Sequence, residues 1–139
     1  MNSALAQLAS NFDRRSHDRL VVPGATVSWA LKGRESLPHE TGPLSDISEG
    51  GLAFLTNDPP TAGLEISLVV FLPPKSQTLE LLGIVAYSIP RGPGLTYAYR
   101  VGVALKPSAH SGDGNAAESL AVIQTLKQTF GKRKGRRPW

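Results

Sequence analysis

Three arginines lie close together near the N-terminus, at positions 14, 15 and 19. Arg15 and Arg19 form an R-x-x-x-R pair, and Arg14 stands directly in front of it. A guanidinium group is a planar fork of donors that fits phosphate oxygens and the O6/N7 edge of guanine. The segment therefore indicates a site for a phosphate-bearing or guanine-containing ligand, although by itself it is more typical of a solvated charged linker.

A second polar motif follows at 46–51, where the sequence reads DISEGG. Asp46 and Ser48 are two residues apart, so their side chains project from the same face of an extended segment. A carboxylate accepts from the N1–H and N2–H₂ edge of guanine, and a hydroxyl can donate or accept. Gly50 and Gly51 permit a tight turn or a close approach of the backbone to a ligand. The two motifs together could hold a guanine nucleotide from both sides without a metal, whereas 46–51 alone is equally typical of a β-turn.

The sequence contains no residue set typical of an enzyme or a metal site. It has no cysteine, which excludes thiolate metal ligands and disulfides. The three histidines, at 17, 39 and 110, are too scattered for metal-ligand spacing. Ser48 lacks the G-x-S-x-G surroundings of a hydrolase nucleophile, and no P-loop is present. We therefore predict a non-enzymatic binding protein with no metal and no cofactor.

The positive charge is concentrated in two short segments. Of the net charge of +4, residues 132–139 contribute +5 and residues 13–19 contribute +1, which leaves −2 for the rest. A nucleic-acid-binding domain more often has a basic face, so no nucleic acid is expected, although the tail leaves contact with an acidic partner, nucleic acid or membrane open. The first ten residues lack the features of a signal peptide, and the longest apolar run, 66–72, is too short to cross a bilayer. We therefore expect a cytoplasmic protein.

The elements that must position these motifs are mostly strands. Short apolar or alternating segments, separated by Gly/Pro turns, predict six strands at 20–31, 42–47, 51–56, 64–72, 79–89 and 96–106. We expect a break at Pro23-Gly24 in the first and a bend at Gly83 in the fifth. Alternation places Leu64 and Tyr97 on the same faces as the apolar residues that follow them. The pattern indicates a small antiparallel barrel or sandwich.

Helical patterns flank the strands. A short helix over 3–12 is predicted, too short to be stable alone. After a polar linker at 108–114, Asn115 and Glu118 predict a capping box and a helix that runs to about residue 130. This helix would cover an opening or an edge of the sheet. Its apolar residues are Leu120, Ile123, Leu126 and Phe130.

The two motifs, in this order and spacing on an all-β pattern, resemble the PilZ domain, the bacterial receptor module for the second messenger cyclic di-GMP. The resemblance covers about residues 14–106. It extends to L-x-L-x-G-x-V at 79–85 and YRVGV at 99–103, which look like the last two strands of the family. Leu105 departs from the pattern, because the family often has an aromatic residue there.

The resemblance implies an all-β fold, a six-stranded antiparallel β-barrel with a C-terminal α-helix. We accordingly divide the chain into an N-terminal extension with a short helix (1–13), the barrel domain (14–107), a linker and helix (108–131) and a basic tail (132–139).

It also implies a function for each motif. The arginine segment would be a mobile loop that wraps over cyclic di-GMP, in which Arg15 and Arg19 contact phosphates and guanines. Asp46 and Ser48 would bind a guanine, and the glycines at 50 and 51 would allow close contact. Arg14 implies an intercalated ligand dimer. Ordering of the loop would signal to an unidentified downstream protein in motility, polysaccharide export or virulence. A PilZ-like scaffold that no longer responds to ligand, and nucleic-acid binding by the tail, remain alternatives, and the oligomeric state is open.

Overall fold

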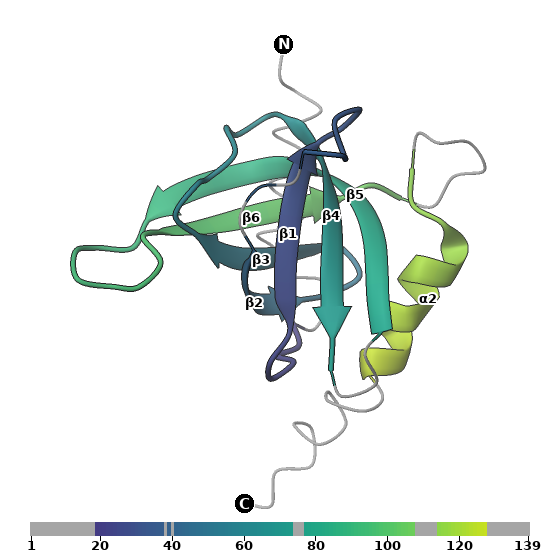
Figure 1. Ribbon diagram of the computed structural model, residues 1–139. Coiled ribbons are helices and arrows are strands. Elements are labelled where there is room, and N and C mark those ends of the chain that lie inside the picture. The colour runs from purple at the N-terminus through teal and green to yellow at the C-terminus, as the bar shows by residue number, and fades with distance from the viewer. Residues whose placement is uncertain (1–18, 38, 40, 74–76, 108–113, 128–139) are drawn as a thin grey trace, which may run out of the picture.

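The computed structural model describes residues 19–37, 39, 41–73, 77–107 and 114–127 (Figure 1). The elements are β1 (Thr26–Leu31), β2 (Gly42–Ile47), β3 (Gly51–Thr56), β4 (Glu65–Leu72), β5 (Gln77–Pro90), β6 (Tyr99–Leu105) and α2 (Ala117–Leu126). All pairings are antiparallel, and the order β1-β2-β3-β6-β5-β4 closes into a barrel when β4 pairs with β1. The predicted six-stranded barrel with a C-terminal helix is thus confirmed. The helix predicted over 3–12, Arg14, Arg15 and the basic tail lie outside the described residues.

Alternate residues of the strands fill the barrel, as the period-two pattern predicted. Burying each such aliphatic side chain contributes about 1.5–3 kcal/mol. Leu64 does not join them and is 40% exposed, because β4 begins one residue later. Tyr97 likewise precedes β6 and is only half-buried. The buried strand residues include Val27, Trp29, Leu52, Phe54, Ile66, Leu68, Val70, Leu72, Leu79, Leu81, Val85, Val101, Val103 and Leu105.

The segment predicted as the first strand is divided in two. Leu20 forms an isolated bridge with Ile47 of β2, with N–H···O distances of 2.8 and 2.9 Å. The chain then turns at Pro23-Gly24, where Gly24 has a φ of +80°, and β1 starts at Thr26. The expected break is confirmed and is a complete turn, because proline supplies no ladder donor. The bridge brings the residue before it, Arg19, beside β2.

Gly83 lies where the long strand β5 changes neighbours. The strand pairs with β4 from Gln77 to Ile84 and with β6 from Gly83 onward. A Cβ at Gly83 would lie 2.4 Å from Val103 Cγ1, so no side chain fits between the crossing strands. The bend predicted at this residue therefore reflects a close approach of two strands.

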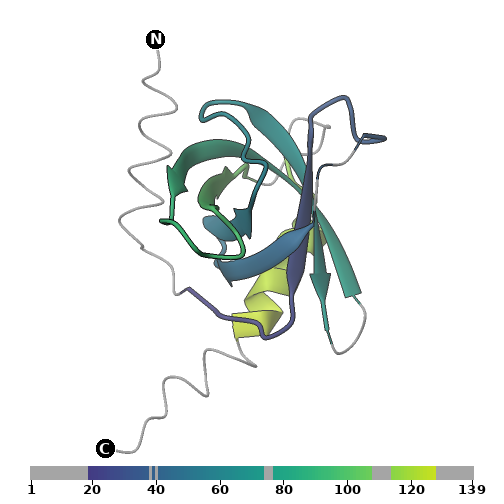
Figure 2. The same cartoon turned by 60° about the vertical axis from the view of Figure 1, so that its left-hand side comes forward.

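Helix α2 covers the edge of β5 that β6 leaves open (Figures 1 and 2). β6 ends at Leu105 opposite Gly83, and just beyond it Leu82 O accepts from Lys106 N at 3.0 Å. Asn115 completes this edge: its Oδ1 accepts from Leu82 N at 2.6 Å, and its Nδ2 donates to Leu82 O and Lys106 O at 3.0 and 2.7 Å. The side chain of Ile123 is buried in the core.

The capping box predicted at Asn115 is wrong. The N-cap is Ala116, which makes no side-chain cap bond, and Asn115 is 98% shielded from solvent by the contacts just described. An unpaired strand edge competes with a helix terminus for the same amide, because both offer free backbone groups. The described helix ends at Leu126, and Phe130 lies outside the described residues.

Candidate functional site

A row of four residues crosses the outer face of the barrel over four neighbouring strands. Asp46 of β2 is opposite Ala53 of β3, Ala53 is opposite Gly102 of β6, and Gly102 is opposite Tyr87 of β5. Ala53 and Gly102 alternate with core residues, so the row faces away from the core. The two middle positions carry almost no side chain. Ala53 and Gly102 are themselves buried, with the Tyr87 ring over Gly102, and form the floor of a row that has a carboxylate at one end and an aromatic ring at the other.

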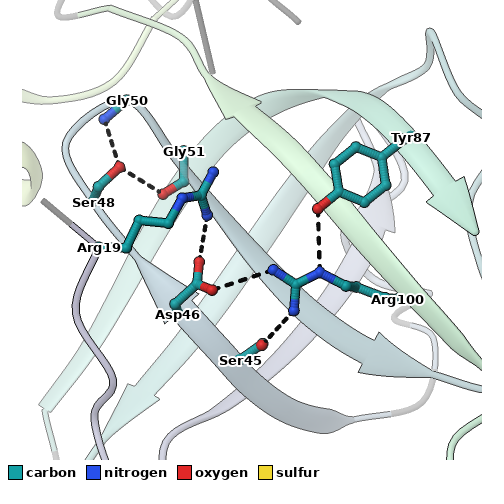
Figure 3. Close-up of polar contacts among 8 residues, drawn as sticks. All are labelled: Arg19, Ser45, Asp46, Ser48, Gly50, Gly51, Tyr87 and Arg100. Atoms are coloured by element: carbon teal, nitrogen blue, oxygen red, sulfur yellow. Dashed lines mark hydrogen bonds and ion pairs between the residues drawn. The ribbon is translucent and has the colours of Figure 1, made fainter. Parts of the chain in front are cut away.

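Two β-bulges decide which side chains reach this face. The β2–β3 register shifts between Leu44 and Asp46, so Ser45 is an extra residue and lies on the same side as Asp46 (Figure 3). The β5–β6 register shifts between Val85 and Tyr87. Regular alternation would have placed Ser45 opposite to Asp46 and Tyr87 in the core with Val85. The bulges thus add a hydroxyl and a phenol to the outer face.

Asp46 lies between two arginines. Arg19 Nη1 donates to Asp46 Oδ1, and Arg100 Nη2 donates to Asp46 Oδ2 at 3.2 Å (Figure 3). The Asp46 side chain is only 15% exposed, and that of Arg19 14%. Removing the carboxylate or the arginines would leave the remaining charge poorly hydrated and without a countercharge, which is costly. The cluster has a net charge of +1 and is therefore attractive to an anion.

Arg100 is held by three different side chains. Besides Asp46, its Nε donates to the Tyr87 hydroxyl at 3.3 Å and its Nη1 donates to Ser45 Oγ at 2.6 Å. Burial acts to lower the pKa of Arg100, but the Tyr87 hydroxyl and the Asp46 carboxylate outweigh it, so the pKa lies above its usual value. The guanidinium is therefore always charged. The ring of Tyr87 lies where a Cβ of Gly102 would be, 2.2 Å from its nearest atom, so only glycine fits beneath the ring.

Ser48 closes the turn that joins β2 to β3. Its N–H donates to Gly51 O at 2.8 Å, and its hydroxyl both donates to Gly51 O and accepts from Gly50 N at 3.3 Å. The residue is 6% exposed. Gly50 O in turn accepts from Leu105 N at 3.0 Å, which ties the turn to β6. In this state the hydroxyl shapes the turn, and its contact with a ligand stays a prediction.

The structure brings some of the predicted site residues together and adds three. Arg19 and Asp46 meet, and the turn at 48–51 follows the same strand (Figure 3). Arg14 and Arg15 lie outside the described residues. Sequence reasoning missed Ser45, Tyr87 and Arg100. Alternation in YRVGV already places Arg100 on the outer face, whereas the bulges that expose the other two leave no clear mark in the sequence.

No group of three or more His, Cys, Asp or Glu side chains capable of holding a metal ion occurs among the described residues. Within the same residues, no helix has both the length and the apolar character needed to span a membrane.

The sequence pattern of the PilZ domain matches residues 13–115 of this chain. The match covers most of the chain, and the protein belongs to the PilZ domain family. No curated protein sequence is significantly similar to it.

Solved structures share the fold at low sequence identity. They include the inhibitor of motility MotI/DgrA of Bacillus subtilis (16% identity, TM-score 0.63), the PilZ domain of Escherichia coli YcgR with c-di-GMP (13%, 0.64) and the K. pneumonia MrkH–c-di-GMP complex (14%, 0.64). The matches cover 89, 87 and 88% of this chain. They cover 53% of MotI/DgrA and 56% of MrkH, but 94% of the YcgR chain. The chain thus corresponds to one PilZ domain and to about half of the two longer proteins.

Proposed function

We propose that this protein is a non-enzymatic receptor that binds cyclic di-GMP on the outer face formed by β2, β3 and β6. The observation that carries the proposal is the Asp46 carboxylate, held between Arg19 and Arg100 above the small residues Ala53 and Gly102. The ligand has two guanines and two phosphates. The carboxylate offers acceptors for the N1–H and N2–H₂ edge, and Arg15 and Arg19 offer donors for phosphate and O6/N7. Family membership and the c-di-GMP complexes of YcgR and MrkH support this ligand.

Binding is an exchange of partners at Asp46. Arg19 occupies Oδ1, so a guanine can take that oxygen only when Arg19 moves away. The released guanidinium then turns to a phosphate or to the O6/N7 edge. One charge-assisted bond replaces another, each contributing about 1.5–3 kcal/mol, so the exchange itself costs little. Arg15 supplies further contacts, and micromolar affinity needs about 8 kcal/mol in total.

Two ligand molecules bind to each chain. This part of the proposal depends on Arg14, which precedes the R-x-x-x-R pair, and on the family resemblance. An intercalated dimer has four phosphate charges, and a third arginine compensates part of them. Titration calorimetry measures the stoichiometry, and a value near one nucleotide per chain would refute the dimer.

Ligand binding orders the arginine segment, and this segment and the turn at 48–51 then present a changed surface to a partner protein. Glu49 of this turn and residues of α2, among them Leu120 and Ala121, line a pocket of about 320 Å³. A shift of the turn would change this surface, which is accessible to another protein. The partner, the process and the cytoplasmic location expected from the sequence remain predictions.

A second candidate function is a PilZ scaffold that does not respond to ligand. The specific observation in its favour is that Asp46 is already satisfied by Arg19 and Arg100, so the face is stable with no nucleotide bound. The two functions are distinguished by whether the chain binds cyclic di-GMP.

Titration calorimetry with cyclic di-GMP at tens of micromolar tests the proposal, because a micromolar site gives a measurable heat there. We expect binding by the whole chain, and loss of binding in Arg15→Ala, Arg19→Ala and Asp46→Ala variants that still unfold cooperatively. Arg91→Ala is the matched control: Arg91 lies in the β5–β6 connection and donates to Tyr97 O at 2.8 Å. No heat from the unmodified chain would sink the receptor and favour the scaffold. Binding that is lost when 131–139 are removed would assign the ligand to the tail.

A further inference from the structure

The two arginines at Asp46 differ in how the surrounding backbone and side chains hold them. Arg100 belongs to β6, which is paired on both sides, with β3 and β5. Each of its three nitrogens has a protein acceptor: Tyr87 OH, Ser45 Oγ and Asp46 Oδ2. Arg19 precedes a single isolated bridge, and the ion pair with Asp46 joins it to the barrel wall. Arg100 is therefore fixed by the fold, whereas in the proposed exchange it is Arg19, beside a single isolated bridge, that moves.

When Arg19 leaves Asp46, the carboxylate still needs a countercharge and a fixed orientation, and Arg100 provides both. Asp46 is largely shielded from water, so a carboxylate with no countercharge would be costly there. It would also be free to rotate away from the incoming base. Arg100 keeps a positive charge at Oδ2 throughout the exchange. Each carboxylate oxygen has two lone pairs, so Oδ2 can accept from Arg100 and from a guanine N–H at the same time.

We infer that Arg100 is a positioning residue for guanine recognition. It fixes the plane of the Asp46 carboxylate, and Tyr87 and Ser45 fix Arg100. This inference rests on the proposed function and deepens it, because it assigns the selectivity of the site for the two-donor edge of guanine to residues outside both sequence motifs. Adenine presents an acceptor at N1 and is repelled by a fixed carboxylate. Hypoxanthine retains N1–H but lacks the N2 amine, so the difference in affinity between guanine and hypoxanthine measures the hydrogen bond from N2 alone.

The side-chain chemistry explains why an arginine is needed. A lysine at position 100 keeps the charge but is a single point donor, so it cannot hold Tyr87, Ser45 and Asp46 at once. Arg100→Lys should therefore weaken ligand binding almost as much as removal of the guanidinium group, although it conserves the charge. Tyr87→Phe removes one anchor of the guanidinium and leaves the other two, so its effect should be smaller.

The experiment compares cyclic di-GMP with its inosine analogue cyclic di-IMP by calorimetry on the full chain. We expect Arg100→Met and Arg100→Lys to weaken cyclic di-GMP binding by about 10- to 100-fold. Both variants should weaken cyclic di-IMP binding less, so that the ratio of the two affinities moves toward one. Arg91→Met is the matched control and should change neither affinity. Thermal unfolding shows whether each variant is folded, and Tyr87→Phe provides a milder change should Arg100→Met fail to fold.

A double-mutant cycle with Asp46→Asn gives the second readout. If Arg100 acts through Asp46, Arg100→Met should change the affinity by less than about twofold in the Asn background. Equal losses in both backgrounds, or an unchanged affinity ratio for the two ligands, would overturn the inference and make Arg100 a direct contact. If Asp46→Asn binds too weakly for the cycle, the ligand ratio decides alone. If the unmodified chain binds neither nucleotide, the proposed function fails, whereas binding that is unaffected in the Arg100 variants defeats only this inference.

Discussion

Two carboxylates in this barrel each lie between two basic side chains, and they differ in almost every other respect. Asp46 is between Arg19 and Arg100, and Glu65 is between Lys32 and Lys106, at 2.9 and 2.8 Å. Asp46 uses both of its oxygens, whereas both lysines contact the same oxygen of Glu65. Glu65 is about twice as exposed, 31% against 15%.

The difference distinguishes a structural ion-pair cluster from the proposed binding site. Lys32 follows β1 and Lys106 follows β6, so Glu65 joins three strands at one end of the barrel through flexible ammonium groups. Such an exposed cluster contributes little free energy. Asp46 is shielded and is held by two planar guanidinium groups, one on a strand paired on both sides and one beside a single isolated bridge. Charge pairing alone therefore does not mark a candidate site, and the proposal rests on the burial of Asp46 and the unequal backbone pairing of its partners.

The largest difference is expected when each carboxylate is removed. Asp46→Ala should weaken cyclic di-GMP binding by at least about 100-fold, because two charge-assisted bonds are lost. It should also lower the free energy of unfolding by about 1–3 kcal/mol, because Arg100 loses its carboxylate. Glu65→Ala should leave the affinity unchanged. Calorimetry and urea unfolding measure the two quantities, and an equal loss of affinity in both variants would break the comparison.

The next effect comes from the floor of the site. Gly102→Ala places a Cβ where the Tyr87 ring lies, so the ring must move and release Arg100. We expect a cost of about 1–3 kcal/mol in stability and roughly tenfold weaker ligand binding. The double variant Gly102→Ala/Tyr87→Ala removes the clash and should regain part of the stability. No recovery would mean that the methyl group acts on something other than the ring.

The two arginines themselves should respond differently to lysine. Arg19→Lys retains a mobile charge for phosphate and should cost less than about tenfold in affinity, whereas Arg100→Lys should cost more, because it loses two anchors. Affinities measured at two salt concentrations sharpen this contrast, since a mobile charge that contacts phosphate depends more strongly on salt. The reverse order would show that Arg19 is the fixed partner.

The smallest effect is a pH dependence at Glu65. Hydrogen bonds from the Lys106 ammonium and, to a smaller extent, from the Lys32 ammonium lower the pKa of Glu65 below its ordinary value of 4.5. A carboxyl group with a lowered folded-state pKa stabilises the fold above pH 4.5, and this contribution is lost as the pH falls through the folded-state pKa. Glu65→Gln should therefore cost about 0.5 kcal/mol at neutral pH, and the cost should shrink as the pH falls below 4.5. A cost that does not change with pH would show that Glu65 acts through packing instead of charge.

The sequence determined the strands and half of the proposed site, and the family resemblance added the closed barrel. Period-two alternation and Gly/Pro turns specify six strands and their inner faces, because burial on one face requires that pattern. The R-x-x-x-R and D-x-S-x-x-G motifs, taken together, predicted that Arg19 and Asp46 belong to one site, although each motif alone has an ordinary structural interpretation. Each motif can be read from local spacing.

The tertiary structure decided the rest, because it depends on groups that are distant in the chain. The bulges at Ser45 and beside Tyr87 bring these side chains to the outer face through the pairing with β3 and β6, and the backbone of Leu82, beyond the end of β6, holds Asn115 away from the helix terminus. Arg100 meets Asp46 across 54 positions because β3 pairs with both β2 and β6 and carries the small residue Ala53 opposite Asp46. Register between strands decides which polar groups meet, and no local pattern specifies it.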